Sequence, residues 1–262
     1  MLDMHNHILY GVDDGSRSLE ESVRMAQMFV QSGYTDLIAT SHFLKGSYEK
    51  QKPFLQNRLD EITQELNKQH INLNLYLGNE LYYESGILDL LKEGRIATLA
   101  NSNYILLEFS FNQAPYGLNN AVYMMQLAGY TPIFAHVERY KYVQANPDWL
   151  KPYIDQGAYI QCNLSYLKKP ESKDYRTIME LLNRGYVHLF GTDAHQSEWR
   201  NPLVKSQLDI LEELLTKEAY QTLLIDNPYA ILHNKDIEMP DEYLKIMPKV
   251  SFLSKIKKKF AG

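Results

Sequence analysis

Two pairs of side chains in this sequence have the spacing of metal ligands on a strand. His5 and His7 are separated by one residue, and Asp193 and His195 repeat that spacing near the other end of the 262-residue chain. Side chains at positions i and i+2 of a strand point to the same face, so each pair can bind one ion through two donor atoms. Either pair alone would be weak support for a metal site.

More potential ligands lie between these pairs, and they include imidazoles and carboxylates but no thiolate. They are Asp13, Asp14, His42, Glu80, Glu108 and His136. Either Asp13 or Asp14 could be the ligand on its loop. A set without cysteine excludes a structural zinc finger and leaves Mn, Fe, Zn or Mg as candidates. About nine ligands are more than one ion needs, which predicts a site with several ions.

The elements that must position these residues are seven short apolar runs. The predicted strands span residues 2–5, 36–40, 73–77, 104–109, 132–135, 158–163 and 187–191. Every candidate ligand lies at the C-terminal end of one of them or on the loop that follows. Segments with helical periodicity separate the runs, so the pattern predicts one parallel α/β sheet that closes into a barrel, with the functional residues at one face.

The helices between these strands begin and end with recognisable signals. Ser18 and Glu21 form an S-x-x-E capping box, and Gly33 ends the same helix. Asn146 and Pro147 are a cap residue and a first helical residue. The remaining predicted helices span residues 53–68, 86–92, 118–128, 172–184 and 203–217.

Composition and charge narrow the class of protein. With 45% apolar and 23% charged residues, we expect one globular domain over residues 1–240 and a basic tail over 241–262. Residues 245–262 hold six lysines and no acidic residue, which leaves −11 on the rest of a chain whose net charge is −5. The acidic body disfavours a nucleic-acid partner. The tail also carries apolar residues, which would allow weak contact with an anionic membrane surface, although a solvated tail is the simpler interpretation.

Cellular location and cysteine chemistry can also be predicted. Cys162 is the only cysteine, and the sequence has neither a long apolar run nor a leader before its first motif. We therefore expect a cytoplasmic protein that is complete as written. A cysteine phosphatase would place an arginine six residues after its nucleophile, and here that position is Lys168.

Six short motifs occur in an order that is typical of a known family. They are H-x-H followed by G-V-D-D-G, T-S-H at 40–42, G-N-E at 78–80, L-L-E-F-S at 106–110, A-H-V-E-R at 135–139 and T-D-A-H at 192–195. This series resembles the polymerase-and-histidinol-phosphatase (PHP) superfamily. Within that superfamily it is similar to the metal-dependent bacterial protein-tyrosine phosphatases that act on capsule and exopolysaccharide tyrosine kinases.

The resemblance implies a distorted (β/α)7 barrel of PHP type with up to three metal ions, usually manganese. It assigns the ligands in three groups, namely His5, His7, Glu80 and Asp193, then Asp14, His42 and His195, and finally Glu80, Glu108 and His136. It also implies hydrolysis of phosphotyrosine, on a tyrosine kinase that controls capsule or exopolysaccharide synthesis, by metal-activated hydroxide. Arg139 and Arg200 would be catalytic and substrate-binding residues that hold the phosphate. The alternative for both arginines is a loop salt bridge to a neighbour such as Glu138 or Glu198.

Other functions stay open at this point. A small-molecule phosphatase such as histidinol-phosphatase would need carboxylates at the rim of the site to bind its cationic substrate. A nuclease or polymerase-associated PHP module would bind DNA, and a non-catalytic metal-binding adaptor would hold a kinase without turnover. A phosphotyrosine suits the predicted site because its phenol, with a pKa of about 10, leaves with less help from a general acid than an alkoxide. Candidate rim residues are Tyr82, Tyr83, Tyr116 and Trp199, whereas His70, His188 and His233 are expected to be packed or surface residues.

Overall fold

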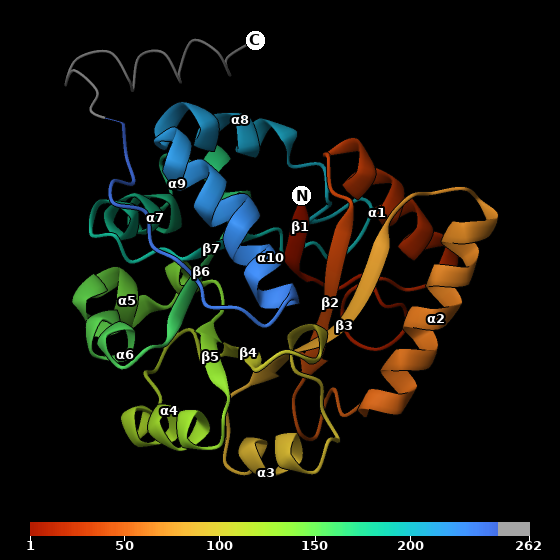
Figure 1. The fold of residues 1–262 in the computed structure, drawn as a ribbon, viewed down its shortest axis with the longest axis horizontal. Coiled ribbons are helices and arrows are strands. Elements are labelled where there is room, and N and C mark those ends of the chain that lie inside the picture. The colour runs from red at the N-terminus through yellow and green to blue at the C-terminus, as the bar shows by residue number, and fades with distance from the viewer. Residues whose placement is uncertain (246–262) are drawn as a thin grey trace.

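The computed structural model describes residues 1–245, and its centre is a parallel sheet of seven strands. The strands follow one another in chain order, as β1 (Leu2–Asn6), β2 (Asp36–Phe43), β3 (Asn74–Tyr82), β4 (Tyr104–Glu108), β5 (Thr131–Phe134), β6 (Tyr159–Asn163) and β7 (Leu189–Gly191). The N–H of His7 donates to the carbonyl of Ala194, and the N–H of Asp193 donates to the carbonyl of His5, each at 2.8 Å. These bonds join the two ends of the sheet, which confirms the predicted (β/α)7 barrel (Figure 1).

The helices surround the barrel (Figure 1). They are α1 (Leu19–Gln31), α2 (Lys52–Lys68), α3 (Ile87–Lys92), α4 (Leu118–Leu127), α5 (Lys141–Ala145), α6 (Lys151–Asp155), α7 (Lys173–Asn183), α8 (Lys205–Leu214), α9 (Lys217–Gln221) and α10 (Asn227–Leu232). Short 3₁₀ turns are η1 (Leu99–Asn101), η2 (Val137–Arg139), η3 (Pro147–Leu150) and η4 (Leu164–Lys168), and η5 (Thr222–Asp226) is a π turn.

The predicted helix signals hold with small differences. The Ser18 hydroxyl accepts from the N–H of Glu21, as a capping box requires, but the Glu21 carboxylate accepts from the N–H of Arg17 instead of Ser18. Asn146 caps η3, which leads into α6. The helix predicted over residues 203–217 is shorter, because Leu215 turns to extended backbone and pairs with Leu244.

A helical stretch that the sequence analysis does not predict follows α8. It consists of α9, η5 and α10, and Asn227-Pro228 opens α10 in the same order as Asn146-Pro147 opens η3. The π turn η5 precedes this pair, and Pro228 lies in the first turn of α10, where a missing N–H is tolerated. Helix α10 lies across one end of the barrel (Figure 1), and its Ile231 is buried among the interior residues.

The barrel interior is apolar at this end and polar at the other. Side chains from several strands fill the apolar end, with Leu2, Met4, Ile38, Leu106, Ile133 and Leu189 among them. Inward positions then continue in steps of two toward the C-terminal ends of the strands, as in Ile38, Thr40 and His42 of β2. Leu106 and Glu108 of β4 follow the same rule. The alternation that points the apolar residues into the barrel therefore also points the polar residues of the site inward at its other end.

Strand β1 breaks this alternation. Its pairing with β2 shifts between Asp3 and Asn6. Met4 belongs to the apolar interior, yet its neighbour His5 faces the carboxylates at the polar end. An irregularity of this kind redirects the side chains that follow it, so His5 and His7 both point into the barrel.

The part of the chain beyond the barrel is described up to Lys245. Tyr243 is buried, and Leu244 pairs with Leu215 next to α8. No helix within residues 1–245 has the length and apolar character needed to cross a bilayer. Five of the six tail lysines of the proposed membrane contact lie outside the described residues, whereas Lys245 donates to the carbonyl of Glu212 at 2.6 Å. The division at residue 240 stays a prediction.

Candidate active site

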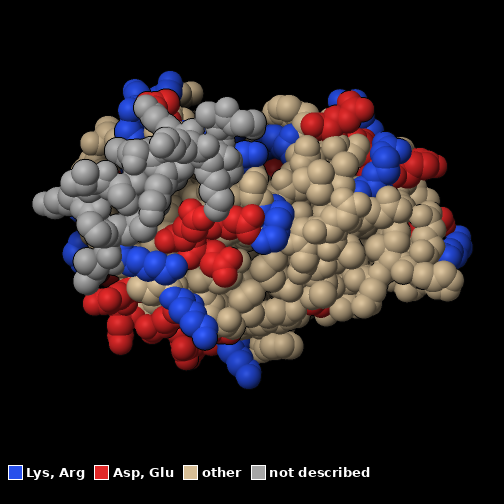
Figure 2. Space-filling model, turned by 90° about the horizontal axis from the view of Figure 1, so that it is seen from above, with Lys and Arg blue, Asp and Glu red and all other residues tan. Residues whose placement is uncertain are grey.

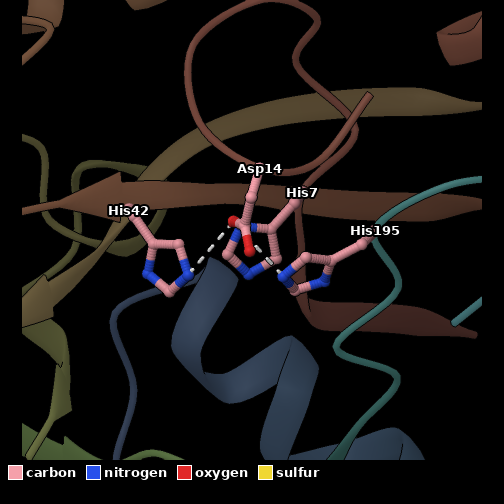
Figure 3. A group of neighbouring side chains, drawn as sticks. All are labelled: His7, Asp14, His42 and His195. Carbon is pink, nitrogen blue, oxygen red and sulfur yellow. Dashed lines mark ion pairs between the residues drawn. The ribbon is translucent and has the colours of Figure 1, made fainter. Parts of the chain in front are cut away.

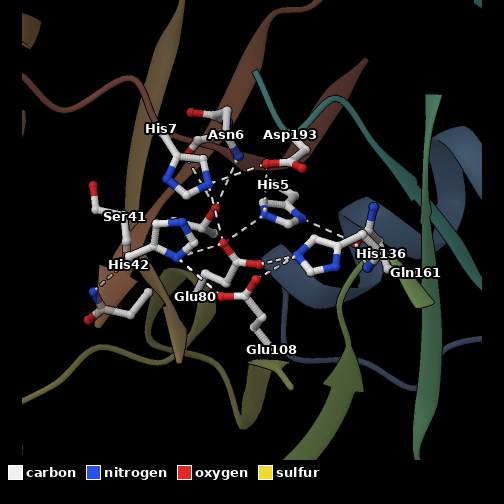
Figure 4. Close-up of polar contacts among 12 residues, drawn as sticks. His5, Asn6, His7, Ser41, His42, Glu80, Glu108, His136, Gln161 and Asp193 are labelled. Atoms are coloured by element: carbon white, nitrogen blue, oxygen red, sulfur yellow. Dashed lines mark hydrogen bonds and ion pairs between the residues drawn. The ribbon is translucent and has the colours of Figure 1, made fainter. Parts of the chain in front are cut away.

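The nine predicted ligands lie together at the polar end of the barrel, and the cavity of 220 Å³ above them is lined by seven of the nine. Most of them are labelled in Figure 4, and Figure 3 shows the group around Asp14. They are His5, His7, Asp14, His42, Glu80, Glu108, His136, Asp193 and His195. Residues far apart in the sequence meet here because the C-terminal ends of parallel strands share one face of the barrel.

Glu80 is the centre of the cluster (Figure 4). Its Oε2 lies 3.2 Å from His5 Nε2, 3.3 Å from His7 Nε2 and 3.1 Å from His42 Nδ1. Its Oε1 lies 2.7 Å from His136 Nε2. A fully buried carboxylate with imidazoles around both oxygens has the position of a ligand shared by more than one ion.

Asp14 lies on the open side of the cluster and faces two histidines (Figure 3). Its Oδ1 is 3.5 Å from His42 Nε2 and 3.6 Å from His195 Nε2. With His7 these residues form a group of four potential ligands. His42 belongs to a second group as well, because its Nδ1 faces Glu80 and Glu108.

Asp193 and Glu108 complete the set. Asp193 Oδ1 lies 3.5 Å from His5 Nε2 and 3.4 Å from His7 Nε2, and Glu108 Oε1 lies 3.5 Å from His136 Nε2. The structure brings the potential ligands together in four groups, whereas the family resemblance implies three. His5, His7, His42 and Glu80 each belong to two of these groups, and Glu108 and His136 fall in different groups.

Asp13 has a different place from Asp14. Asp13 accepts a hydrogen bond from His7 Nδ1 at 2.8 Å and from the N–H of His42 at 2.9 Å. This arrangement turns His7 Nε2 toward the other ligands. Asp13 therefore holds two potential ligands in place, whereas Asp14 belongs to a group of potential ligands itself.

Gln161 of β6 has the same supporting role on the other side. Its Oε1 accepts from His5 Nδ1 at 3.1 Å and from the N–H of His136 at 2.8 Å. Asn163, two residues on, donates to Asp193 Oδ2 at 2.6 Å. Neither residue is among the predicted site residues, although two amides at alternate positions of an apolar strand are a signal of a buried polar role.

Burial and the charges of the cluster shift the pKa values of its residues, upward for His7 and downward for Glu80. Burial would raise the pKa of Glu80, but the surrounding histidines, His5 first, hold it well below its usual range. Burial and the negative charge of Glu80 raise the pKa of Glu108 to about 9. Burial lowers the pKa of His136 to about 4 and that of His195 to about 2, which keeps both imidazoles neutral, the form that binds metal.

The unpaired atoms of the cluster support the same conclusion. Nε2 of His5, Nε2 of His7 and Oε2 of Glu80 are buried and make no hydrogen bond within the described chain. Buried lone pairs that face one another are costly unless a proton or a cation lies between them. The residues present therefore fit a group of divalent metal ions.

The two predicted phosphate-binding arginines lie beside the cluster. Arg200 pairs with Asp193 Oδ2, and Arg139 Nη1 lies 3.7 Å from the same oxygen. Arg139 also lies over the ring of Phe111, 4.2 Å from its centroid. Both arginines line the cavity, and their carboxylate partner is Asp193, not Glu138 or Glu198.

Aromatic and apolar side chains form the walls of the cavity. Tyr82 is among them, as predicted for a rim residue, and Leu44, Tyr48 and Phe111 are wall residues that the sequence analysis does not identify. The Tyr48 ring stacks on His42 with centroids 5.8 Å apart. Nothing in the composition of the 44–48 loop indicates this position, which depends on the pairing of its two ends.

The other predicted rim residues lie further out. Tyr83 and Tyr116 line a neighbouring groove, which shares Tyr82 with the cavity. Trp199 is 59% exposed, with the Arg200 guanidinium 5.3 Å from its ring. These three side chains are not among the residues that line the cavity.

Unusual backbone geometry occurs at the site. His136, Asp193 and Arg200 have φ values of 33°, 52° and 49°, a region that costs a non-glycine residue free energy and often occurs at functional sites. A Cβ on Gly15 would lie 2.3 Å from the carbonyl oxygen of His7. A Cβ on Gly191 would lie 2.8 Å from the Cβ of His5. Both glycines therefore allow the backbone to approach the ligand strand β1.

The remaining histidines and the cysteine are outside this cluster. His188 is buried and its Nδ1 accepts from the N–H of Ile160, while His70 and His233 are exposed, as predicted. Cys162 is buried, and burial raises the pKa of its thiol well above the usual value. A thiol of this kind is a poor nucleophile.

Comparison with known proteins places this chain in a family. A profile of the family described as capsular polysaccharide synthesis, CpsB/CapC, matches residues 1–233. The chain belongs to the CpsB/CapC family. It is 30% identical over 240 residues to the tyrosine-protein phosphatase CpsB of Streptococcus agalactiae, covering 89% of this chain and 99% of that protein. It is 33% identical to the putative tyrosine-protein phosphatase CapC of Staphylococcus aureus, covering 90% and 93%.

Solved structures agree with this family membership. A structure from a study of YwqE from Bacillus subtilis and CpsB from Streptococcus pneumoniae, described as unique metal-dependent tyrosine phosphatases, superposes with a TM-score of 0.87. The identity is 28%, and the match covers 94% of this chain and all of that one. An organophosphorus hydrolase from Deinococcus radiodurans matches at 13% identity with a TM-score of 0.56, over 88% of this chain and 91% of the other, which shows a shared barrel fold.

Proposed function

We propose that this CpsB/CapC family member is a metal-dependent protein-tyrosine phosphatase that hydrolyses phosphotyrosine. The observation that carries the proposal is the cluster of nine imidazole and carboxylate ligands with two arginines beside it. The names of the relatives support the choice of substrate. We further propose His5, His7, Asp14, His42, Glu80, Glu108, His136, Asp193 and His195 as the ligands, with manganese as the metal.

The chain's own residues account for most of the proposed mechanism. Divalent ions, when bound, provide an attacking group from water near neutral pH and neutralise charge on the phosphoryl group. Arg139 and Arg200 bind the phosphoryl oxygens through their guanidinium groups, in exchange for part of their contact with Asp193. Asp13 and Gln161 hold the ligand imidazoles in fixed orientations. The aromatic wall with Tyr48 and Phe111 suits an aryl leaving group.

The substrate protein and the setting belong to the proposal as well. The family description names capsular polysaccharide synthesis. We propose a tyrosine kinase of capsule or exopolysaccharide synthesis as the partner, in the cytoplasm, with no nucleic acid involved. On the face that carries α8 and α9, acidic and basic side chains are interspersed beside an uncharged area (Figure 2). The described residues visible in this view form no continuous basic track of the kind that binds a phosphate backbone.

The test is hydrolysis of a phosphotyrosine peptide and of histidinol phosphate by the full-length protein, stripped of metal and then reloaded with Mn²⁺. We expect peptide turnover that requires the metal and is lost in His136→Ala. Turnover of histidinol phosphate alone would replace the proposal with a small-molecule phosphatase. Metal binding without turnover of either substrate would indicate an adaptor.

A further inference from the structure

A basic groove lies between α5 and α7, outside the catalytic cavity. It has a volume of 680 Å³, and its lining includes Lys141 and Gln144 of α5 with Lys173, Arg176 and Glu180 of α7. The two helices lie side by side at the edge of the barrel (Figure 1). We name these five residues and the space between them the α5–α7 groove.

The cations of this groove have no partners of their own. Lys141, Lys173 and Arg176 are exposed, and none of them forms an ion pair within residues 1–245. The acidic residue of the groove, Glu180, is paired with Arg184 at 2.8 Å. Three cations without an ion-pair partner around one hollow favour an anionic ligand there.

The groove and the catalytic cavity share a wall. Turn η2 ends at Arg139, which lines the cavity, and α5 begins two residues later at Lys141, which lines the groove. Because consecutive Cα atoms are about 3.8 Å apart, the Cα atoms of these two residues are within about 7.6 Å. The N–H of Lys141 donates to the carbonyl of Phe111, another residue of the cavity.

The shared wall is also held from the groove side. The Gln144 side-chain amide donates to the carbonyl of Glu138 in η2 at 2.8 Å and to Asp174 Oδ1 of α7 at 3.3 Å. The position of the groove relative to the arginine is therefore set by hydrogen bonds. A peptide whose phosphotyrosine enters the cavity would reach the groove with the residues that flank it.

We propose that the α5–α7 groove binds an acidic segment of the substrate polypeptide next to the phosphotyrosine. Glutamate or aspartate side chains of that segment pair with Lys141, Lys173 and Arg176. This inference rests on the proposed phosphatase function and adds a preference for acidic flanking sequence. Its effect is on KM more than on kcat, because these cations do not touch the phosphoryl group.

The experiment compares two phosphotyrosine peptides that differ only in whether the flanking residues are glutamates or glutamines. The variant is Lys173→Gln with Arg176→Gln, and the matched control is Lys217→Gln with Arg24→Gln, which removes the same charge from exposed positions elsewhere. We expect kcat/KM for the acidic peptide to fall about three- to tenfold in the groove variant only, and kcat/KM for the neutral peptide to stay unchanged.

The outcomes separate this inference from the function on which it depends. Turnover of p-nitrophenyl phosphate, which has no flanking residues, tests the phosphatase chemistry alone. Binding of the unphosphorylated acidic peptide, followed by fluorescence anisotropy, tests the groove even in the absence of turnover. Three results for the groove variant would overturn the inference. They are an equal loss of kcat/KM for both peptides, no loss of kcat/KM for the acidic peptide, or a loss of binding to phosphatidylserine vesicles with no change toward either peptide.

Discussion

The Asp13 carboxylate lies 2.8 Å from Nδ1 of His7, and the same oxygen accepts the N–H of His42 at 2.9 Å. One side chain thus orients two potential ligands without being among them. We predict that Asp13→Ala raises the Mn²⁺ concentration needed for half-maximal activity about 10- to 100-fold. Asp13→Asn should lose less of its affinity for Mn²⁺, because the amide oxygen can still accept one of the two hydrogen bonds. Equal metal affinity in Asp13→Ala and the wild type would contradict this role.

The two arginines are expected to act on the phosphate and not on the metal. Arg139→Lys and Arg200→Lys keep the positive charge but remove the planar pair of donors, so kcat/KM for a phosphotyrosine peptide should fall about 100-fold in each. Metal content, measured by atomic emission, should stay at the wild-type level, in contrast to His42→Ala. Loss of metal in the lysine variants would indicate that the arginines act through Asp193 instead.

Metal removal should lower thermal stability, because the cluster then holds buried carboxylates without a cation. Mn²⁺ at about 100 times its dissociation constant adds about 2.7 kcal/mol to the free energy of unfolding. For a chain of this size this corresponds to an increase in Tm of roughly 5–10 °C. Differential scanning calorimetry with chelator and with Mn²⁺ measures this shift. Glu80→Gln should abolish most of this shift in Tm, whereas the control His70→Ala should leave it unchanged. A full shift in Glu80→Gln would mean that the ions bind elsewhere.

The glycines next to β1 are predicted to be required for the geometry of the site. A Cβ on Gly15 would meet the backbone oxygen of His7 at 2.3 Å, whereas a Cβ on Gly191 would meet side-chain atoms of His5 and Gln161 at 2.8 and 2.9 Å. Backbone yields less readily than side chains, so Gly15→Ala should reduce both activity and Tm more than Gly191→Ala. Neither Gly15 nor Gly191 has a positive φ, so these substitutions test the steric clash without added backbone strain. A larger loss of activity and Tm in Gly191→Ala than in Gly15→Ala would contradict this prediction.

Stability should depend on pH through His188. Burial lowers the pKa of His188 to about 3, compared with about 6.5 in an unfolded chain. As the pH falls, His188 therefore binds a proton at a higher pH in the unfolded state than in the folded state. The free energy of unfolding thus falls between about pH 6.5 and pH 3, by up to about 1.4 kcal/mol per pH unit. In His188→Asn, whose Oδ1 can accept the Ile160 N–H, this part of the slope should disappear.

The control for this measurement is His70→Asn, because His70 is exposed. Urea unfolding of the three proteins between pH 4.5 and 7.5, with metal removed, gives the slopes to be compared. A slope in His188→Asn equal to that of the wild type would show that other groups carry the whole dependence.

Much of the scaffold could be predicted from local patterns. All seven strands are apolar runs that polar loops or helix caps delimit, and a strand of that kind is recognisable without its neighbours. The positions of His42, Glu80 and Glu108 followed from the same patterns, since each comes at the end of a run. In a parallel barrel the ends of the strands meet, which brought these residues together in the prediction.

Other features depend on contacts between segments that are distant in the sequence. The shift in β1 that turns His5 inward arises in its pairing with β2, and the role of Asp13 exists only because His7 and His42 lie on either side of it. Helix α10 is not predicted from the sequence, and its position across the end of the barrel depends on burial of Ile231 among the interior residues. Local spacing identifies which residues can do chemistry, but the partner of each atom is decided by the packing of the strands, since only that packing sets the distances between them.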